Sequence, residues 1–284
     1  MSRPRGVSVI IPTYNRAAFL TDAIRSVIDQ KGNFAIDLIV VDDGSTDDTE
    51  EVVAKFGDDV RYHRIEPSGR PAVPRNVGIR MAKYDLIAFQ DSDDRWVADK
   101  LQLQIGVFDD PNVALSYGNA AKMTDSGATT SDKMIDQHMA KSGFIFENLL
   151  NTNFISTLTV MVRKPAFDQV GLFDESPSLR AVEDYHLWLR IAANHKIMYV
   201  DEVLAYYREH ANNISASSQY KAHLLLSRVY SQLGPLPAAQ KGLVHDRCSG
   251  VYTQLYRLSG GNPKYLLLSI YHRAMKKLLP KGAS

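Results

Sequence analysis

The segment from Asp85 to Trp96 constrains the fold of this 284-residue chain more than any other. The apolar run Leu86–Phe89 predicts one strand buried on both faces, as in a parallel sheet, whose ligands bind beyond the carboxyl ends of the strands. Three carboxylates follow at once, at Asp91, Asp93 and Asp94. Because they repel one another, a hard divalent cation such as Mg²⁺ or Mn²⁺, also bound to phosphate oxygens, would suit them. The alternative is a solvated acidic turn that caps the next helix.

Apolar runs alternate with helical patterns along the first 120 residues. Strands alternating with helices predict an α/β fold, a mostly parallel sheet flanked by helices. Asp47 followed by Glu50 predicts the N-cap of a helix that runs to Phe56. The expected strands are Val7–Ile11, Leu38–Val41, Val60–Ile65, Leu86–Phe89 and Val113–Tyr117.

The pattern loosens between residues 121 and 143, and a loop of this length in a compact domain is usually functional or mobile. Further strands are expected at Leu158–Val162, Met198–Val200 and Leu204–Tyr207, and a helix over Glu183–Ala193. From Ser217 onward two or three helices are expected. We therefore predict a domain over residues 1–215, with halves of about 1–120 and 121–215, and a helical C-terminal extension over residues 216–284.

Composition excludes several classes of protein. A net charge of +1 gives no sign of nucleic-acid binding. The single cysteine, Cys248, excludes an internal disulfide and a cysteine-based zinc site, so we expect a reducing, cytoplasmic compartment. No apolar run has the length of a membrane span, and we expect no signal peptide at the N-terminus.

The C-terminal region is basic, because no Asp or Glu follows Asp246. Residues 263–281 interleave apolar with basic side chains, which is typical of a helix that lies on an anionic membrane. The same pattern fits a helix packed on the rest of the chain or on another subunit. A peripheral membrane contact and a homo-oligomer are therefore both open.

Six motifs of the chain, taken together and in order, resemble the inverting glycosyltransferases of family 2, whose nucleotide-sugar-binding fold is called GT-A. The resemblance covers roughly residues 7–215. The motifs are Val9–Arg16, Val40–Asp47, Arg75–Ile79, Gln90–Asp94, Gly171–Glu175 and Glu183–Arg190.

The resemblance implies a nucleotide site in the half over residues 1–120. Tyr14 can stack on a base, Asp43 can accept the imino N–H of uracil, and Arg75 at a helix start suits a diphosphate. Alternatively, Tyr14 is an ordinary rim or core tyrosine, Asp42 and Asp43 only stabilise a turn or cap a helix, and Arg75 is a surface arginine. The nucleotide-binding residues implied are Pro12, Thr13, Tyr14, Asp42, Asp43, Arg75, Asp91 and Ser92.

The resemblance also implies a metal site and a catalytic base. Asp93, with Asp91, matches the metal-binding pair, and His210 is either a further ligand for Mn²⁺ or Mg²⁺ or a structural histidine. Asp184 matches the general base, and Glu183 is the reserve candidate or an acceptor-orienting group. The alternative for this acidic pair is a plain helix start favoured by the helix dipole.

We therefore expect a metal-dependent inverting glycosyltransferase that moves a sugar from a nucleoside diphosphate, most simply UDP, to an acceptor hydroxyl. The acceptor would be a carbohydrate or a lipid-linked molecule used in surface polysaccharide or glycoconjugate synthesis, at the inner face of the cell membrane or in the cytoplasm. Two alternatives stay open. A sugar nucleotidyltransferase is disfavoured, because its glycine-rich basic loop is absent after the first strand, and the other is a non-catalytic nucleotide-sugar-binding or assembly module.

Overall fold

The computed structural model describes residues 6–210 and 218–279. Residue contacts divide the chain into two units, which are described separately below. The first unit comprises residues 1–143, 154–173 and 195–213, and the second comprises residues 144–153, 174–194 and 214–284. The boundary predicted between residues 215 and 216 lies outside the described residues and stays a prediction.

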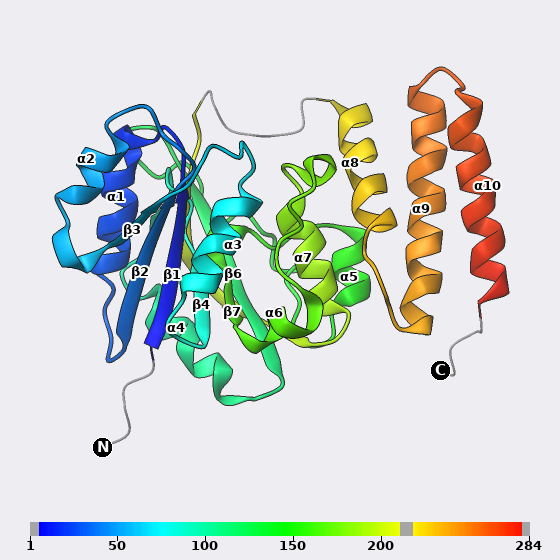
Figure 1. The fold of residues 1–284 in the computed structure, drawn as a ribbon. Helices are drawn as coiled ribbons and strands as arrows, with labels where there is room; N and C mark the ends of the chain where they lie inside the picture. Colours follow the sequence, from blue (N-terminus) through cyan, green and yellow to red (C-terminus); the bar gives the residue numbers. More distant parts are fainter. Residues whose placement is uncertain (1–5, 211–217, 280–284) are drawn as a thin grey trace. The chain divides into compact units, whose positions relative to one another are not determined.

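The first unit is built on an eight-stranded sheet of the described residues, in the order β3-β2-β1-β4-β7-β6-β8-β5 (Figure 1). β1 pairs in parallel with β2 and β4, and β6 with β8, whereas β7 and β5 pair antiparallel with their neighbours. The mostly parallel α/β fold is thereby confirmed. The strands are β1 (Gly6–Thr13), β2 (Ala35–Asp42), β3 (Arg61–Arg64), β4 (Leu86–Phe89), β5 (Arg95–Trp96), β6 (Val113–Met123), β7 (Met161–Arg163) and β8 (Lys196–Arg208).

Helices of the first unit cover the sheet and bury their apolar sides against it. The buried side of α1 packs with β1 in the main hydrophobic cluster. On α3, Gly78 lies so close to β1 that an added Cβ would meet the Ile10 side chain at 2.5 Å. The helices are α1 (Ala17–Ile28), α2 (Thr49–Ala54), α3 (Ala72–Met81), α4 (Lys100–Ile105) and α6 (Pro165–Val170), with short 3₁₀ turns at Gly57–Asp59, Gly106–Asp109 and Thr157–Thr159.

Four predictions of local structure were wrong. The strand expected at Leu158–Val162 is a 3₁₀ turn at Thr157–Thr159 followed by β7 at Met161–Arg163. The two strands expected near Met198 and Leu204 form the single strand β8, because register shifts against β6 accommodate the charged pair Asp201-Glu202. β6 continues to Met123, so the irregular segment begins later than residue 121. Asp47 does not cap a helix, because α2 begins at Thr49 after Asp48. Instead the Asp47 carboxylate accepts hydrogen bonds from the backbone N–H of Ala17 and from Thr49.

A buried carboxylate joins the strands near their amino ends. Asp37 accepts hydrogen bonds from Ser8 Oγ and Arg61 Nη1, each at 2.8 Å, and from the Lys83 N–H at 3.0 Å. Burial alone would raise the pKa of Asp37, but these hydrogen bonds outweigh it and lower the pKa. One ionised side chain thus connects β1, β2, β3 and the turn before β4.

The second unit is helical. Tyr185 of α7 and Tyr230 of α8 donate hydrogen bonds to the carbonyls of Leu149 and Leu150 on α5, each at 2.9 Å. α9 and α10 form a hairpin that turns at Gly260, whose φ is +70°. The C-terminal helices predicted are therefore present, and none of the helices within the described ranges is long and apolar enough to cross a membrane. The helices are α5 (Phe146–Asn151), α7 (Glu183–Ala192), α8 (Gln219–Ser231), α9 (Ala238–Leu258) and α10 (Pro263–Leu278), with a 3₁₀ turn at Pro177–Leu179.

Candidate active site

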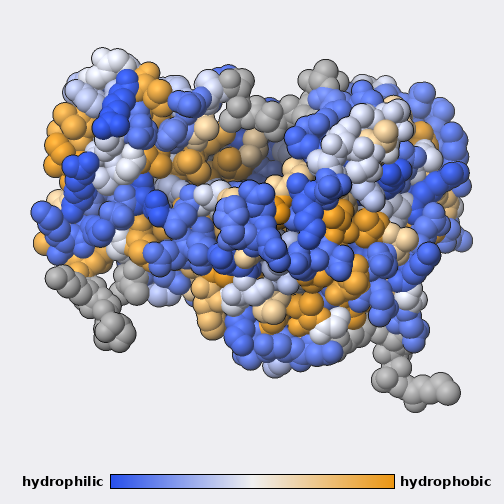
Figure 2. Space-filling view, turned by 180° about the vertical axis from the view of Figure 1, so that it is seen from behind, coloured by the Kyte–Doolittle hydropathy of each residue, from blue (hydrophilic) through white to orange (hydrophobic). Residues whose placement is uncertain are grey.

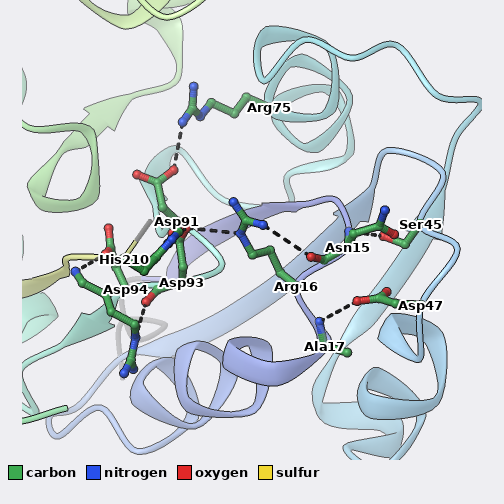
Figure 3. A network of polar contacts seen from close by, with 11 residues as sticks. Asn15, Arg16, Ala17, Ser45, Asp47, Arg75, Asp91, Asp93, Asp94 and His210 are labelled. Carbon is green, nitrogen blue, oxygen red and sulfur yellow. Dashed lines mark hydrogen bonds and ion pairs between the residues drawn. The ribbon is translucent and has the colours of Figure 1, made fainter. Parts of the chain in front are cut away.

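The loops that follow β1 and β2 are tied to each other. The Asn15 N–H donates to Ser45 Oγ at 2.9 Å (Figure 3). Asn15 Oδ1 accepts from the Thr46 N–H at 2.8 Å. Asn15 has a φ of +50°, a left-handed conformation that asparagine tolerates better than most residues. The buried Asp42 accepts from Ser45 and from Tyr62 Oη. These contacts are those of a turn-holding residue, and a direct nucleotide contact for Asp42 stays a prediction.

Asp43 organises the loop that precedes α3. Its carboxylate accepts hydrogen bonds from the N–H groups of Ser68 and Gly69, at 2.8 and 2.9 Å, and from Ser68 Oγ at 3.0 Å. A carboxylate has about four acceptor positions, so one remains for a ligand donor. Tyr14 is 51% exposed at the end of β1, where its ring is accessible for stacking. The geometry therefore allows the uracil-reading and base-stacking roles that the sequence predicts.

The carboxylates after β4 are surrounded by cationic side chains (Figure 3). Asp91 accepts from Arg75 Nη2 at 2.8 Å. Asp93 accepts from Arg16 Nε at 3.3 Å and lies 3.0 Å from His210 Nε2. β1, β2 and β4 are neighbours in the sheet, so the loops after them lie at the same edge. The structure thus brings Asp93 and His210 into contact at this edge, and Asp91 lies in the same loop and contacts Arg75.

Asp94 is fully buried beside this pair. Burial raises its pKa well above the usual value, and the charges of Asp91 and Asp93 raise it further. Its carboxylate accepts a hydrogen bond from the Arg208 N–H at 2.8 Å. Asp94 therefore holds the loop from inside.

Arg208, which the sequence analysis missed, is the main support of this loop. Its buried guanidinium donates from Nε to the Asp93 carbonyl at 2.8 Å, and it also contacts the carbonyls of Thr124 and Asp125. The guanidinium lies 5.0 Å over the ring of Phe19. The only signal in the sequence is its position at the end of an apolar strand pattern, where an arginine needs buried partners.

The oxygen and nitrogen atoms of Asp91, Asp93 and His210 are of the kinds that bind Mg²⁺ or Mn²⁺. No group of three or more His, Cys, Asp or Glu side chains within residues 6–210 and 218–279 is arranged around one metal position. Mg²⁺ and Mn²⁺ do not require such a cage, because one or two carboxylates and substrate phosphates suffice. Asp91 and Asp93 are partly exposed, and the His210 ring is held by stacking on Phe19, 5.4 Å between centroids. These residues allow a metal bound together with substrate phosphates, and the metal role of Asp91, Asp93 and His210 stays a prediction.

The prediction that Arg75 lies at a helix start was wrong. α3 begins at Ala72, and the Arg75 N–H donates to the Pro71 carbonyl, so it offers no free N–H to a phosphate. The guanidinium reaches Asp91 and lies 5.5 Å over the Phe173 ring. The next residue, Asn76, exchanges two hydrogen bonds with the Phe173 backbone, at 2.8 and 3.0 Å. The motifs Arg75–Ile79 and Gly171–Glu175 are therefore in direct contact in the structure.

Buried polar atoms mark the ends of β1 and β4. Thr13 Oγ1 and both amide atoms of Gln90 have no hydrogen-bond partner in the described part of the chain. Pro12 is half-buried and Ser92 is buried at the same edge. Gln90 was not predicted as a site residue, because an amide next to three carboxylates gives no separate signal in the sequence. A nucleotide contact for Pro12, Thr13 and Ser92 stays a prediction.

Glu183 and Asp184 begin α7 in the second unit, whereas the carboxylates after β4 belong to the first. Glu183 is buried and Asp184 half-buried, and Asp184 Oδ1 accepts from the Tyr185 N–H at 2.7 Å. Two residues earlier, Ala181 has a φ of +74°, a strained conformation for a residue other than glycine. The roles of the pair as base and reserve base stay predictions.

The fold and its edge site define a class of enzymes that use nucleotide sugars, the GT-A glycosyltransferases. Residues 8–171 match the family model described as "Glycosyl transferase family 2". The chain belongs to this family and is a glycosyltransferase.

Two curated relatives match most of the chain. The putative teichuronic acid biosynthesis glycosyltransferase TuaG of Bacillus subtilis is 32% identical over 80% of this chain and 88% of its own length. The Escherichia coli UDP-Glc:alpha-D-GlcNAc-diphosphoundecaprenol beta-1,3-glucosyltransferase WfgD is 31% identical over 80% of this chain and 85% of its own length.

Solved structures share the fold. S. aureus TarS in complex with UDP has a TM-score of 0.64 and 21% identity, over 87% of this chain and 72% of that chain. The mannosyltransferase PcManGT of Pyrobaculum calidifontis, in complex with GDP-Man and Mn²⁺, has a TM-score of 0.61 and 20% identity, over 100% of this chain and 77% of that chain. At such identities the likeness concerns the GT-A fold alone.

Proposed function

We propose that this glycosyltransferase transfers a sugar from a UDP-sugar to the hydroxyl of a lipid-linked or carbohydrate acceptor in surface polysaccharide synthesis, with inversion at the anomeric carbon. One observation carries the proposal: Asp91 and Asp93 lie directly after β4 with Arg16, Arg75 and His210 in contact with them. Such a cluster suits the charges of a diphosphate and a divalent ion.

Asp93, with Asp91 and His210, would hold Mn²⁺ or Mg²⁺. When bound, the ion would neutralise negative charge on the departing nucleoside diphosphate. Arg75 and Arg16 would position the diphosphate oxygens, because both already point at the carboxylates from neighbouring elements (Figure 3). Tyr14 would stack on the base, and Asp43 would accept the imino N–H that uracil carries and cytosine lacks.

Asp184 would take the proton of the acceptor hydroxyl, with Glu183 orienting the acceptor or serving as the reserve base. Direct displacement by that hydroxyl, without a covalent intermediate on the enzyme, leads to inversion. The lipid-linked acceptor is proposed by analogy with WfgD, whose name states a diphosphoundecaprenol acceptor, and it would bring the enzyme to the inner face of the cell membrane. The uridine preference is supported by the name of WfgD, and GDP is the alternative that PcManGT represents. The remaining acceptor position of Asp43 disfavours cytosine but fits either base.

The test uses the full chain with Mn²⁺, a water-soluble acceptor and a panel of UDP- and GDP-sugars, with release of the free nucleoside diphosphate (UDP or GDP) as the readout. Asp93→Asn should lower turnover about a hundredfold or more, since it removes a charged group from the leaving-group site. Asp99→Asn, an exposed carboxylate close by in sequence, is the control and should keep full turnover. Equal turnover of the two variants would refute the proposed metal-binding role of Asp93. Turnover with GDP-sugars alone would refute the proposed preference for uridine.

A further inference from the structure

The last helix, α10, has two apolar sides, only one of which is used within the chain. The inner side packs against α9: Tyr265 stacks on Tyr252, His272 contacts His245, and Ser269 is buried beside Ser249. The opposite side carries large apolar residues that remain exposed: Leu266, Leu267, Ile270, Tyr271 and Leu278, of which Leu267 is 67% and Leu278 77% exposed. A surface helix normally has a single apolar side, so the second one requires a partner.

The exposed residues form one continuous stripe. At about 100° per residue, Leu267, Ile270 and Leu278 fall within one third of the helix circumference, and Leu266 and Tyr271 border them. Lys264 and Lys277 lie at its margins, and neither has an ion-pair partner in the part of the chain that the structure describes. In Figure 2 the side of the second unit on which α10 lies carries hydrophobic residues interspersed with hydrophilic ones.

Charge decides which partner fits. The chain has no Asp or Glu after Asp246, and Asp246 itself pairs with Lys276 at 2.8 Å. Two copies meeting through this stripe would bring Lys264 and Lys277 of one copy near the same charges of the other, which costs free energy. An anionic lipid surface instead attracts the lysines and accepts the leucines and the tyrosine at headgroup level. The 16-residue helix is also too short and too basic to span a bilayer, so it would lie along the surface.

We propose that the outer side of α10 binds the surface of an anionic membrane, with Leu267, Ile270 and Leu278 inserted below the headgroups and Lys264 and Lys277 on the anionic lipids. The binding surface belongs to the second unit alone. It is therefore independent of the donor, metal and acceptor assigned above.

The experiment is flotation of the full chain with vesicles of phosphatidylcholine containing about one third phosphatidylglycerol, and with vesicles of pure phosphatidylcholine. The full chain should float with the anionic vesicles only. The triple variant Leu267→Ser/Ile270→Ser/Leu278→Ser should bind them about a hundredfold more weakly. Lys264→Gln/Lys277→Gln should bind about twentyfold more weakly, because each lysine near the surface contributes about a fivefold factor.

Two control variants test whether loss of any exposed apolar side chain, or of any two exposed lysines, weakens vesicle binding. Phe144→Ser removes another exposed large apolar side chain, and Lys31→Gln/Lys55→Gln removes two exposed lysines elsewhere, so both should float like the unchanged chain. All substitutions are on exposed positions, whereas deleting α10 would uncover α9. Failure of the unchanged chain to bind anionic vesicles would overturn the proposal. So would a dimer, seen by light scattering without lipid, that the triple variant abolishes. Turnover with a water-soluble acceptor reports on the catalytic proposal separately.

Discussion

Replacing Arg208 by lysine should weaken both the fold and donor binding. The Arg208 side chain is 2% exposed, and its guanidinium contacts the carbonyls of Asp93, Thr124 and Asp125 and, at 3.2 Å, the Asp22 carboxylate. A lysine ammonium keeps the charge but cannot reproduce the planar fork, so at least two of the three carbonyls would lose a partly buried hydrogen bond. Each costs about 1–3 kcal/mol, which places the loss of unfolding free energy at about 3 kcal/mol.

Arg208→Lys should also affect nucleotide binding, because one of the lost hydrogen bonds is to the Asp93 carbonyl. Because the Asp93 backbone is one of the acceptors, Arg208→Lys should also weaken Mn²⁺-dependent binding of UDP about tenfold, measured by calorimetry below the unfolding transition. Arg163→Lys is the matched control: Arg163 donates to three carbonyls and lies 5.4 Å over the Phe108 ring, but it does not contact the loop after β4. Identical UDP affinities for the two variants, in the presence of the predicted stability loss, would refute the support role.

Three further predictions concern the first unit. Asp37→Asn should lower the unfolding free energy by about 2–3 kcal/mol near neutral pH in urea titrations. The pKa of Asp37 is lower in the folded than in the unfolded chain, so ionised Asp37 stabilises the fold at pH values above its unfolded pKa. This stabilisation is lost as the pH falls through the folded pKa. The Asp37→Asn variant should lose no stability from this source on acidification. Burial lowers the pKa of Lys100 well below its usual value, so stability should rise with pH between the lowered and the usual pKa, and Lys100→Met should abolish the rise. Gly78→Ala should cost about 2–3 kcal/mol in the same titration, and it should cost less in an Ile10→Ala background, because the new Cβ meets Ile10.

Most of the sheet could be predicted from the sequence because each of its central strands is a short apolar run that ends in polar residues. β8 could not, since Asp201-Glu202 within an apolar pattern is typical of a turn, and only pairing with β6 shows that the strand continues. β5 was missed for a similar reason. Two residues, Arg95 and Trp96, form a strand only because β8 offers them a partner.

The carboxylates of the site could be predicted, but Arg16 and Arg208, which contact the side chain and the backbone of Asp93, could not. Asp91 and Asp93 are close in sequence, so their repulsion is visible in the chain itself. Arg16 and Arg208 lie 77 and 115 residues from Asp93, and nothing local indicates that β1 and β8 end beside the same loop. The sequence therefore indicates which charges need compensation, while the topology decides which side chains provide it.

The charge balance at this edge explains why the site can exist before a donor binds. Asp91 and Asp93 are each in contact with a guanidinium, from Arg75 and Arg16, and Asp94 is sheltered from water, where burial favours its neutral form. A nucleotide sugar and a divalent ion arriving together carry charges that largely cancel, so the balance survives their binding. Either one alone would leave an uncompensated charge in a partly buried site, which is costly. In the proposed site the same two arginines would pair with the carboxylates before the donor binds and with the diphosphate afterwards.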